Sequence, residues 1–151
     1  RSGGGGALAA SASTAAGPIP KVYWTDGRSL KIQRASLDGG DVEDLPISGL
    51  ARPQGIFADA LFRKLYWADG LAAKIQRSNL DGGDVEDVFT ASSGLTYPTG
   101  IAVDSLGAKI YWSDSGVLRR ARLDGADVEE LAVTGLIAPW GIAVDKSKTR
   151  G

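Results

Sequence analysis

The chain is organised around a four-residue motif that occurs three times. It reads Tyr23-Trp24-Thr25-Asp26 first, then Tyr66-Trp67-Ala68-Asp69, then Tyr111-Trp112-Ser113-Asp114. The copies begin at residues 23, 66 and 111, so the period is 43 and then 45 residues. A period of this length fits one four-stranded propeller blade per repeat. The spacing therefore predicts three copies of one β-sheet unit.

The rest of each unit recurs in the same order. A Leu-Asp-Gly segment follows each motif, then an Asp-Val-Glu segment, and then Pro-x-Gly-Ile at residues 53–56, 98–101 and 139–142. This ordered set closely resembles the low-density lipoprotein receptor class B, or YWTD, repeat over roughly residues 20 to 145. The resemblance implies blades of a six-bladed β-propeller, with the motif residues as scaffold. It also implies protein recognition outside the cell, so an extracellular or secreted location is expected from the resemblance alone.

Composition divides the chain into three parts. Residues 1–20 are expected to be a low-complexity Gly/Ala/Ser linker, residues 21–145 the three repeats, and residues 146–151 a basic tail. Seventeen basic and eighteen acidic residues leave a net charge of −1, which gives no strong field to recruit nucleic acid. Apolar runs are far shorter than the roughly 20 residues that cross a bilayer, so no membrane insertion is expected.

The repeats read as strands, so the predicted fold is all-β. Short runs rich in β-branched and aromatic residues alternate with Gly and Asp-Gly, which favours strands over helices. The first repeat is expected to hold strands at 21–25, 31–36 and 41–47, with a tight hairpin at 38–40. The next blade begins with a strand at 55–58. Continuing the count to a last strand at 141–144 predicts three blades of four strands each.

This strand order has a consequence for assembly. Three blades cannot close a toroid, because propellers normally have about four to eight. The first blade lacks its innermost strand, and residues 141–144 form a spare strand of that type. We therefore expect a homodimer in which 141–144 of each copy completes the first blade of the other, closing six blades. The alternatives are a fragment of a longer six-repeat chain and a larger assembly.

Composition argues against an enzyme. The chain has no histidine and no cysteine, which removes Ser-His-Asp and Cys-His nucleophiles and the usual zinc ligands. Carboxylates that recur in register are predicted to accept backbone N–H bonds at turns: Asp26, Asp69 and Asp114, and likewise Asp59, Asp104 and Asp145. The chain is expected to be no enzyme and to hold no cofactor. A metal-dependent propeller hydrolase, the less favoured alternative, would need non-repeated carboxylates on the ring axis.

Other recurrent side chains are also predicted to be structural. Trp24, Trp67 and Trp112 should fill the space between blades, while Arg34, Arg77 and Arg120 should pair with carboxylates or stack there. The acidic hairpins could alternatively supply oxygen ligands for calcium. Solvated acids in glycine-rich turns are the simpler interpretation of these residues, which are Asp38, Asp41, Glu43 and Asp44 with their counterparts Asp81, Asp84, Glu86 and Asp87.

Residues that break the repeat are the candidates for specificity. Trp140 stands between Pro and Gly where the other copies have Gln54 and Thr99. Tyr97 lies in a loop lengthened by two residues, and Arg52 precedes the same segment in the first copy. These five are the predicted binding residues for a protein or peptide ligand. The alternatives are that Trp140 packs against a neighbouring blade, and that the chain is a structural repeat subunit of a larger extracellular assembly.

Overall fold

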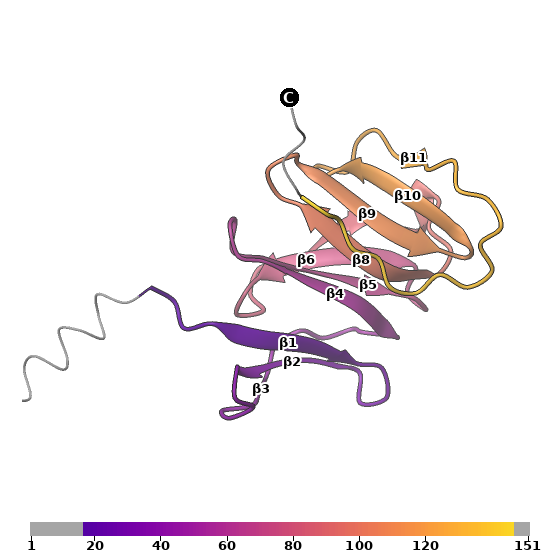
Figure 1. The fold of residues 1–151 in the computed structure, drawn as a ribbon. Helices are drawn as coiled ribbons and strands as arrows, with labels where there is room; N and C mark the ends of the chain where they lie inside the picture. Colours follow the sequence, from indigo (N-terminus) through magenta and orange to yellow (C-terminus); the bar gives the residue numbers. More distant parts are fainter. Residues whose placement is uncertain (1–16, 147–151) are drawn as a thin grey trace, which may run out of the picture.

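The computed structural model describes residues 17–146 of the chain, and Figure 1 shows them as three antiparallel sheets stacked face to face. The first sheet has the order β1-β2-β3, the second β4-β5-β6-β7, and the third β11-β10-β9-β8. The strands are β1 (Lys21–Asp26), β2 (Lys31–Ser36), β3 (Glu43–Asp44), β4 (Pro53–Asp59), β5 (Lys64–Asp69), β6 (Lys74–Asn79), β7 (Glu86–Phe89), β8 (Pro98–Asp104), β9 (Lys109–Asp114), β10 (Val117–Arg122) and β11 (Glu129–Glu130).

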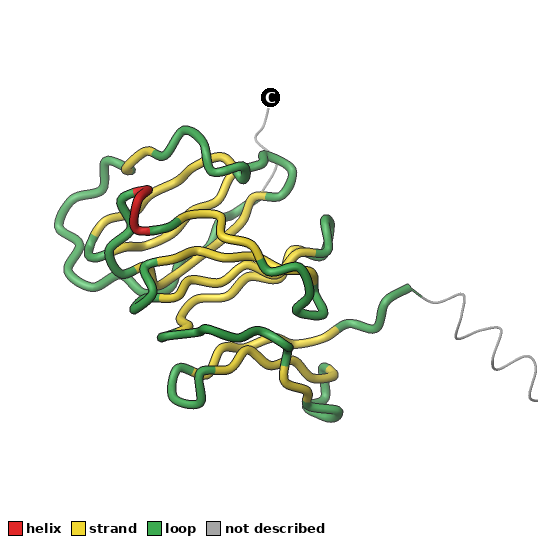
Figure 2. Tube along the Cα trace, turned by 180° about the vertical axis from the view of Figure 1, so that it is seen from behind, coloured by secondary structure: helices red, strands yellow, loops and turns green. Residues whose placement is uncertain are grey.

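The observed sheets confirm the predicted propeller blades. Short loops join successive strands, as the tube in Figure 2 shows, and the 3-10 turn η1 (Ala91–Ser93) is the only helix in residues 17–146. No helix in that range is long and apolar enough to cross a membrane. The hairpins turn at Gly39, Gly82 and Gly125 with φ of +88°, +88° and +91°, a region that disfavours residues with a Cβ. The predicted glycine hairpins are thus confirmed.

The core lies between the sheets in two clusters. Trp67 and Leu65 pack against Ile32 and Leu45 between the first and second sheets. Trp112, Tyr66 and Ile75 pack with Phe89 between the second and third sheets, where the Phe89 and Trp112 ring centroids are 4.8 Å apart. Trp67 and Trp112 are fully buried, which confirms that they fill the space between blades. Trp24 is only half-buried, because no sheet in the described chain covers its side of the first blade.

In the first two blades a hydrogen bond also joins the motif tryptophan to the neighbouring strand. The indole Nε1 of Trp24 donates to Gln33 Oε1 at 3.0 Å, and that of Trp67 donates to Gln76 Oε1 at 3.2 Å. In the third blade Arg119 takes the place of this glutamine, and the buried Trp112 Nε1 has no hydrogen-bond partner in the structure. This contact was not predicted, although Ile-Gln-Arg recurs in the first two repeats and becomes Leu-Arg-Arg in the third.

The sequence predicted two strands incorrectly. The segment 41–47 contributes only Glu43 and Asp44 to a strand, because Asp41 turns with φ of +52° and Ile47 folds back onto the Leu45 carbonyl. Residues 141–144 form no strand, since no described strand has an edge available beside them. Of the predicted linker and tail, 1–16 and 147–151 lie outside the described residues.

The stability of this fold should fall at acidic pH and should not change across the neutral range. Backbone N–H bonds from Ser29 and Arg28 lower the pKa of Asp26, and the hydrogen bond and charge of Arg120 lower the pKa of Glu129. A carboxyl with a lowered folded pKa stabilises the fold above its unfolded pKa of about 4, and this contribution is lost as pH falls through the folded value. No histidine titrates near pH 6.5.

We therefore expect the thermal midpoint to be constant from about pH 5 to 8 and to fall below about pH 4. Circular dichroism melts across this range test the expectation. A step in the midpoint between pH 5 and 8 would contradict it.

Candidate inner-loop binding face

Of the five predicted binding residues, Arg52 and Tyr97 lie in the loops just before β4 and β8, Gln54 and Thr99 are the second residues of those strands, and Trp140 lies in the C-terminal segment. We call Arg52, Gln54, Tyr97, Thr99 and Trp140 the inner-loop face. In the second and third blades the motif aspartate fixes the loop before the blade's own inner strand. Asp69 accepts the N–H groups of Ala51 and Arg52 at 2.8 and 2.7 Å. In the third blade Asp114 accepts those of Thr96 and Tyr97 at 3.0 and 2.7 Å. The predicted structural role of these carboxylates is confirmed.

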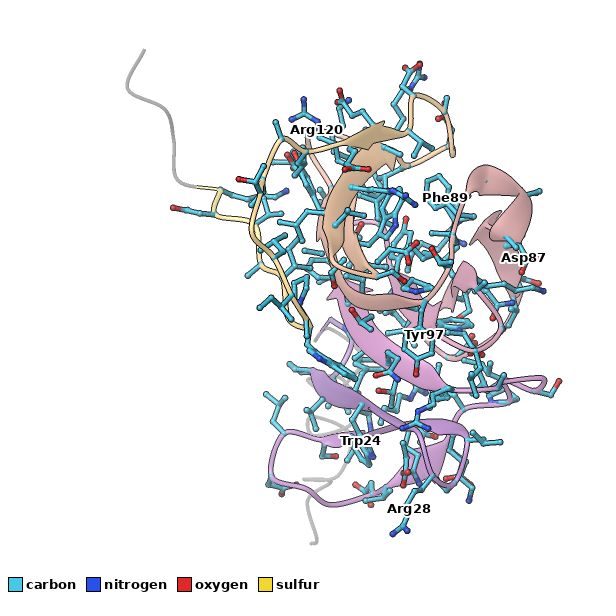
Figure 3. The ribbon with its side chains drawn as sticks, turned by 90° about the vertical axis from the view of Figure 1, so that its right-hand side faces the viewer. Trp24, Arg28, Asp87, Phe89, Tyr97 and Arg120 are labelled. Carbon is cyan, nitrogen blue, oxygen red and sulfur yellow. The ribbon has the colours of Figure 1, made fainter. Side chains whose placement is uncertain are left out.

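Two members of the inner-loop face meet directly. The amide Nε2 of Gln54 donates to the Tyr97 hydroxyl at 3.2 Å, which joins the second blade to the third. The Tyr97 ring lies on Gly70, where a Cβ would come within 2.8 Å of the ring. Figure 3 shows Tyr97 near the middle of the stack, between the labelled Trp24 and Arg120. Both side chains are half-buried, so each keeps part of its surface open to a ligand.

Thr99 is placed differently from the other four. Its side chain is 7% exposed, and its hydroxyl contacts Ser113 Oγ at 2.7 Å and donates to the Pro139 carbonyl at 3.2 Å. Ser113 Oγ in turn accepts the Gly100 N–H at 2.8 Å and donates to the Trp140 carbonyl at 3.3 Å. Thr99 therefore positions the C-terminal segment and offers no free surface. The role of Ser113 was not predicted; its signal in the sequence is the hydroxyl at the third motif position.

Trp140 and Arg52 are the exposed members of the inner-loop face. The Trp140 side chain is 57% exposed, while its backbone lies against the third blade through the Ser113 bond. Arg52 is exposed, and its position is fixed by its backbone N–H bond to Asp69. In this chain, then, the Trp140 ring is open to solvent and no neighbouring blade covers it. Large exposed aromatics are uncommon on folded proteins and often mark a contact site.

The other charged residues engage one another at the outer strands. Arg34, Arg77 and Arg120 pair with Glu43, Glu86 and Glu129 across adjacent strands, which confirms the predicted pairing. Lys31 Nζ and Gln33 Nε2 donate to Asp44 at 2.7 and 2.6 Å. Several of the acids considered as calcium ligands thus have cationic or amide partners on their own sheets, namely Glu43, Asp44, Glu86 and Asp87. Within residues 17–146 no three metal-binding side chains converge on one point.

A cavity also lies beside the first sheet. It has a volume of about 680 Å³ and is lined by Tyr23, Arg34, Ala58 and Leu80, with Pro18 and Ile19. None of the five residues of the inner-loop face lines it. We place the candidate site on the inner-loop face because it holds the exposed Trp140 and the Gln54–Tyr97 pair, whereas the cavity is a gap beside the first sheet.

Comparison with known proteins identifies the family. The model of the low-density lipoprotein receptor repeat class B matches residues 20–59 and 63–105, together more than half of the chain. The chain belongs to this family. Its repeats are therefore class B repeats, as the motifs predicted. The comparison with curated proteins gave no match.

Solved structures agree with the class B repeat assignment. The chain is similar to a crystal structure of a nidogen/laminin complex, with a TM-score of 0.77 and 32% identity over 84% of this chain. It spans 49% of that chain, or about half its length.

Two lyases share the fold alone. A streptogramin B lyase matches with a TM-score of 0.62 and 15% identity over 85% of this chain and 42% of its own. A catalytically inactive virginiamycin B lyase from Staphylococcus aureus with quinupristin matches with a TM-score of 0.56 and 19% identity, over 77% of this chain and 39% of its own.

Proposed function

We propose that the chain is an extracellular protein-binding module with no chemistry of its own. The observation that carries the proposal is the inner-loop face, which combines the exposed Trp140 with the Tyr97–Gln54 pair and the exposed Arg52. Tryptophan, tyrosine and arginine are the residues that most often dominate protein interfaces. Aspartate bonds to the backbone hold the loops of Arg52 and Tyr97, and Ser113 holds the Trp140 carbonyl, so the face is ordered before a partner arrives.

The similarity to a nidogen/laminin complex supports a protein partner of the extracellular matrix. The lyases support no catalytic role, because at 15% and 19% identity they indicate the fold only. We further propose that the three blades are half of a six-bladed ring that a second copy completes. A structural subunit in a larger extracellular assembly is the second candidate, favoured by the uncovered face around the half-buried Trp24.

Binding to purified matrix proteins tests the proposed function. Laminin, which is named in the similar complex, is the first probe for surface plasmon resonance. Trp140→Ala is expected to weaken binding about tenfold or more, because it removes the exposed aromatic of the inner-loop face. Leu106→Ala is the matched control, since Leu106 is 81% exposed in the turn after β8, at the far end of that strand.

An equal loss in both variants, or no loss in Trp140→Ala, would contradict the placement of the binding surface. Absence of binding to every matrix protein tested would contradict the proposed function itself.

A further inference from the structure

We propose that residues 137–145 of one copy form the innermost strand of the first sheet in a second copy, and that the exchange is reciprocal. The inference rests on the proposed ring closure and specifies its mechanism, which is a composite blade made from two chains. Four observations support it: the shape of the segment, its position, the free edge of β1, and the half-covered Trp24.

The loop that leads into the segment already has the conformation of its counterparts. Leu131 N donates to the Leu118 carbonyl at 2.8 Å, as Leu45 N donates to that of Ile32 at 2.9 Å. The next turn also repeats, because Val133 N bonds the Leu131 carbonyl at 2.7 Å just as Ile47 N bonds that of Leu45 at 2.7 Å. The chain therefore forms the lead-in to a fourth inner strand although no fourth sheet is described.

The glycine turn of the lead-in repeats as well. Gly49, Gly94 and Gly135 have φ of +77°, +87° and +80°, so each of the three loops reverses at the same point before its inner strand. The residue after each glycine is a leucine: Leu50, Leu95 and Leu136.

The segment also lies where an inner strand belongs. It runs alongside β8 (Figure 1), held by the Thr99 bond to the Pro139 carbonyl at 3.2 Å and the Ser113 bond to the Trp140 carbonyl at 3.3 Å. The first blade holds β4 in the same way, because Thr25 Oγ1 donates to the Gln54 carbonyl at 2.5 Å. Thr25 and Ser113 occupy the same motif position, as do Gln54 and Trp140.

The receiving edge is β1. In the second and third sheets, β5 and β9 each pair with an inner strand, whereas β1 pairs only with β2 among the described strands. The motif carboxylate shows the same difference. Within residues 17–146, the backbone N–H groups that Asp26 accepts come from Arg28 and Ser29 in its own turn, while Asp69 also accepts two from the loop before β4. The N–H groups of Ile137 and Ala138 occupy the matching position in the C-terminal loop.

Apolar side chains are exposed on both surfaces that the proposed junction would bring together. Trp67 is covered by a cluster that includes Ile47 and Leu50 from the loop before β4. The counterparts of these two residues are Val133, which is 47% exposed, and Leu136, which is half-buried. On the first sheet, Trp24 is half-buried and Val22 is 43% exposed, and no such cluster covers them in the described chain. Placing Val133 and Leu136 of a second copy on Trp24 would bury apolar surface on both chains.

The existing sheets set the register of the composite blade. Ile56 pairs with Trp67 and Ala58 with Leu65 in the second sheet, and the third sheet repeats this register. The same register places Ile142 opposite Trp24, Ala143 opposite Tyr23 and Val144 opposite Val22 of the second copy. Pairing in this register at both junctions gives two chains a ring of six blades, a number within the usual range for propellers.

Cysteine cross-linking between two chains tests the register. The chain has no cysteine of its own, so every disulfide must come from the introduced residues. Opposed residues on antiparallel strands have Cα atoms about 4.5 to 5.5 Å apart, which suits a disulfide. Val22→Cys protein mixed with Val144→Cys protein is expected to form the mixed disulfide dimer under mild oxidation. Val22→Cys mixed with Ala143→Cys is the control, since the shift of one residue moves the second thiol to the other face.

A second variant tests the junction without disturbing the single chain. A Cβ on Gly141 meets nothing within 4 Å in one copy, whereas on the equivalent Gly55 it would lie 2.4 Å from the Thr99 carbonyl. The composite blade presses Gly141 against β4 of the second copy. Gly141→Ala should therefore raise the dimer dissociation constant about tenfold or more and leave the circular dichroism spectrum unchanged. Gly17→Ala, which is equally open, is the matched control.

The outcomes separate this inference from ring closure itself. If the mass is that of a dimer but the Val22–Val144 cross-link does not form, the composite blade is overturned and the ring closes through another interface. The same holds if the Gly141→Ala dimer has the dissociation constant of the wild type. A monomeric mass with no cross-link overturns both. Cross-linked chains of increasing length support the strand pairing and overturn the closed ring.

Discussion

Replacing Asp69 by alanine is expected to lower the free energy of unfolding by about 4 kcal/mol. The carboxylate is fully buried and accepts three backbone N–H groups, from Ala51 at 2.8 Å, Arg52 at 2.7 Å and Ala72 at 3.2 Å. Alanine leaves these donors without a partner, and each buried unsatisfied donor costs about 1 to 3 kcal/mol. Because small domains are stable by only about 5 to 15 kcal/mol, the loss is a large share of the total.

Urea unfolding at a fixed protein concentration measures this loss, since self-association makes the apparent stability depend on concentration. Asp38→Ala is the control, because Asp38 is exposed and accepts only the Gly40 N–H at 2.8 Å. It should cost about 1 kcal/mol or less. Similar losses for the two variants would show that the motif carboxylate does not hold the inner loop.

Gly55→Ala should be nearly as damaging, with an expected loss of about 3 kcal/mol. An added Cβ would lie 2.4 Å from the Thr99 carbonyl and 3.0 Å from Gly100 Cα. Both atoms belong to the backbone of β8, so the clash can be relieved only by separating the second and third sheets. That separation would loosen the cluster around Trp112.

The control for this variant is Gly27→Ala, whose Cβ would make an ordinary contact at 3.5 Å with the Pro53 carbonyl. Both variants replace glycine by alanine, so the effect of this change on backbone conformational entropy largely cancels when the two are compared. Thermal melts should show a much lower midpoint for Gly55→Ala than for Gly27→Ala. Equal midpoints would show that the sheets are less closely packed than the structure indicates.

Periodicity predicts most of this fold because each blade repeats the same local chemistry. The strand at Lys31–Ser36 has the predicted bounds, and Trp67 and Trp112 are buried between sheets as expected. Alternating apolar residues and glycine turns act within a few residues of one another, so one sequence is enough to locate them.

Predictions that depended on a distant neighbour were less successful. The segment 141–144 forms no strand because a strand exists only where an edge pairs with it, and pattern alone does not supply the edge. Thr99 aligns with Trp140 in the repeat, yet Thr99 is buried and Trp140 is exposed. Thr99 is covered by the segment that contains Pro139 and Trp140. No further segment covers Trp140 in the same way among the described residues.

The inner-loop face could be predicted only in part. Residues that depart from the repeat indicated Trp140 and Tyr97, but the bond between Gln54 and Tyr97 joins two blades and has no local signal. The role of Ser113 was missed for a similar reason, since its partners lie 13, 14 and 27 residues away in sequence.

Light scattering across a dilution series tests the central claim most directly. Two copies that exchange their C-terminal segments and close one ring predict a mass near twice 15.7 kDa, stable to dilution. A mass of 15.7 kDa, or an open ladder of larger sizes, would contradict the six-bladed ring of two chains.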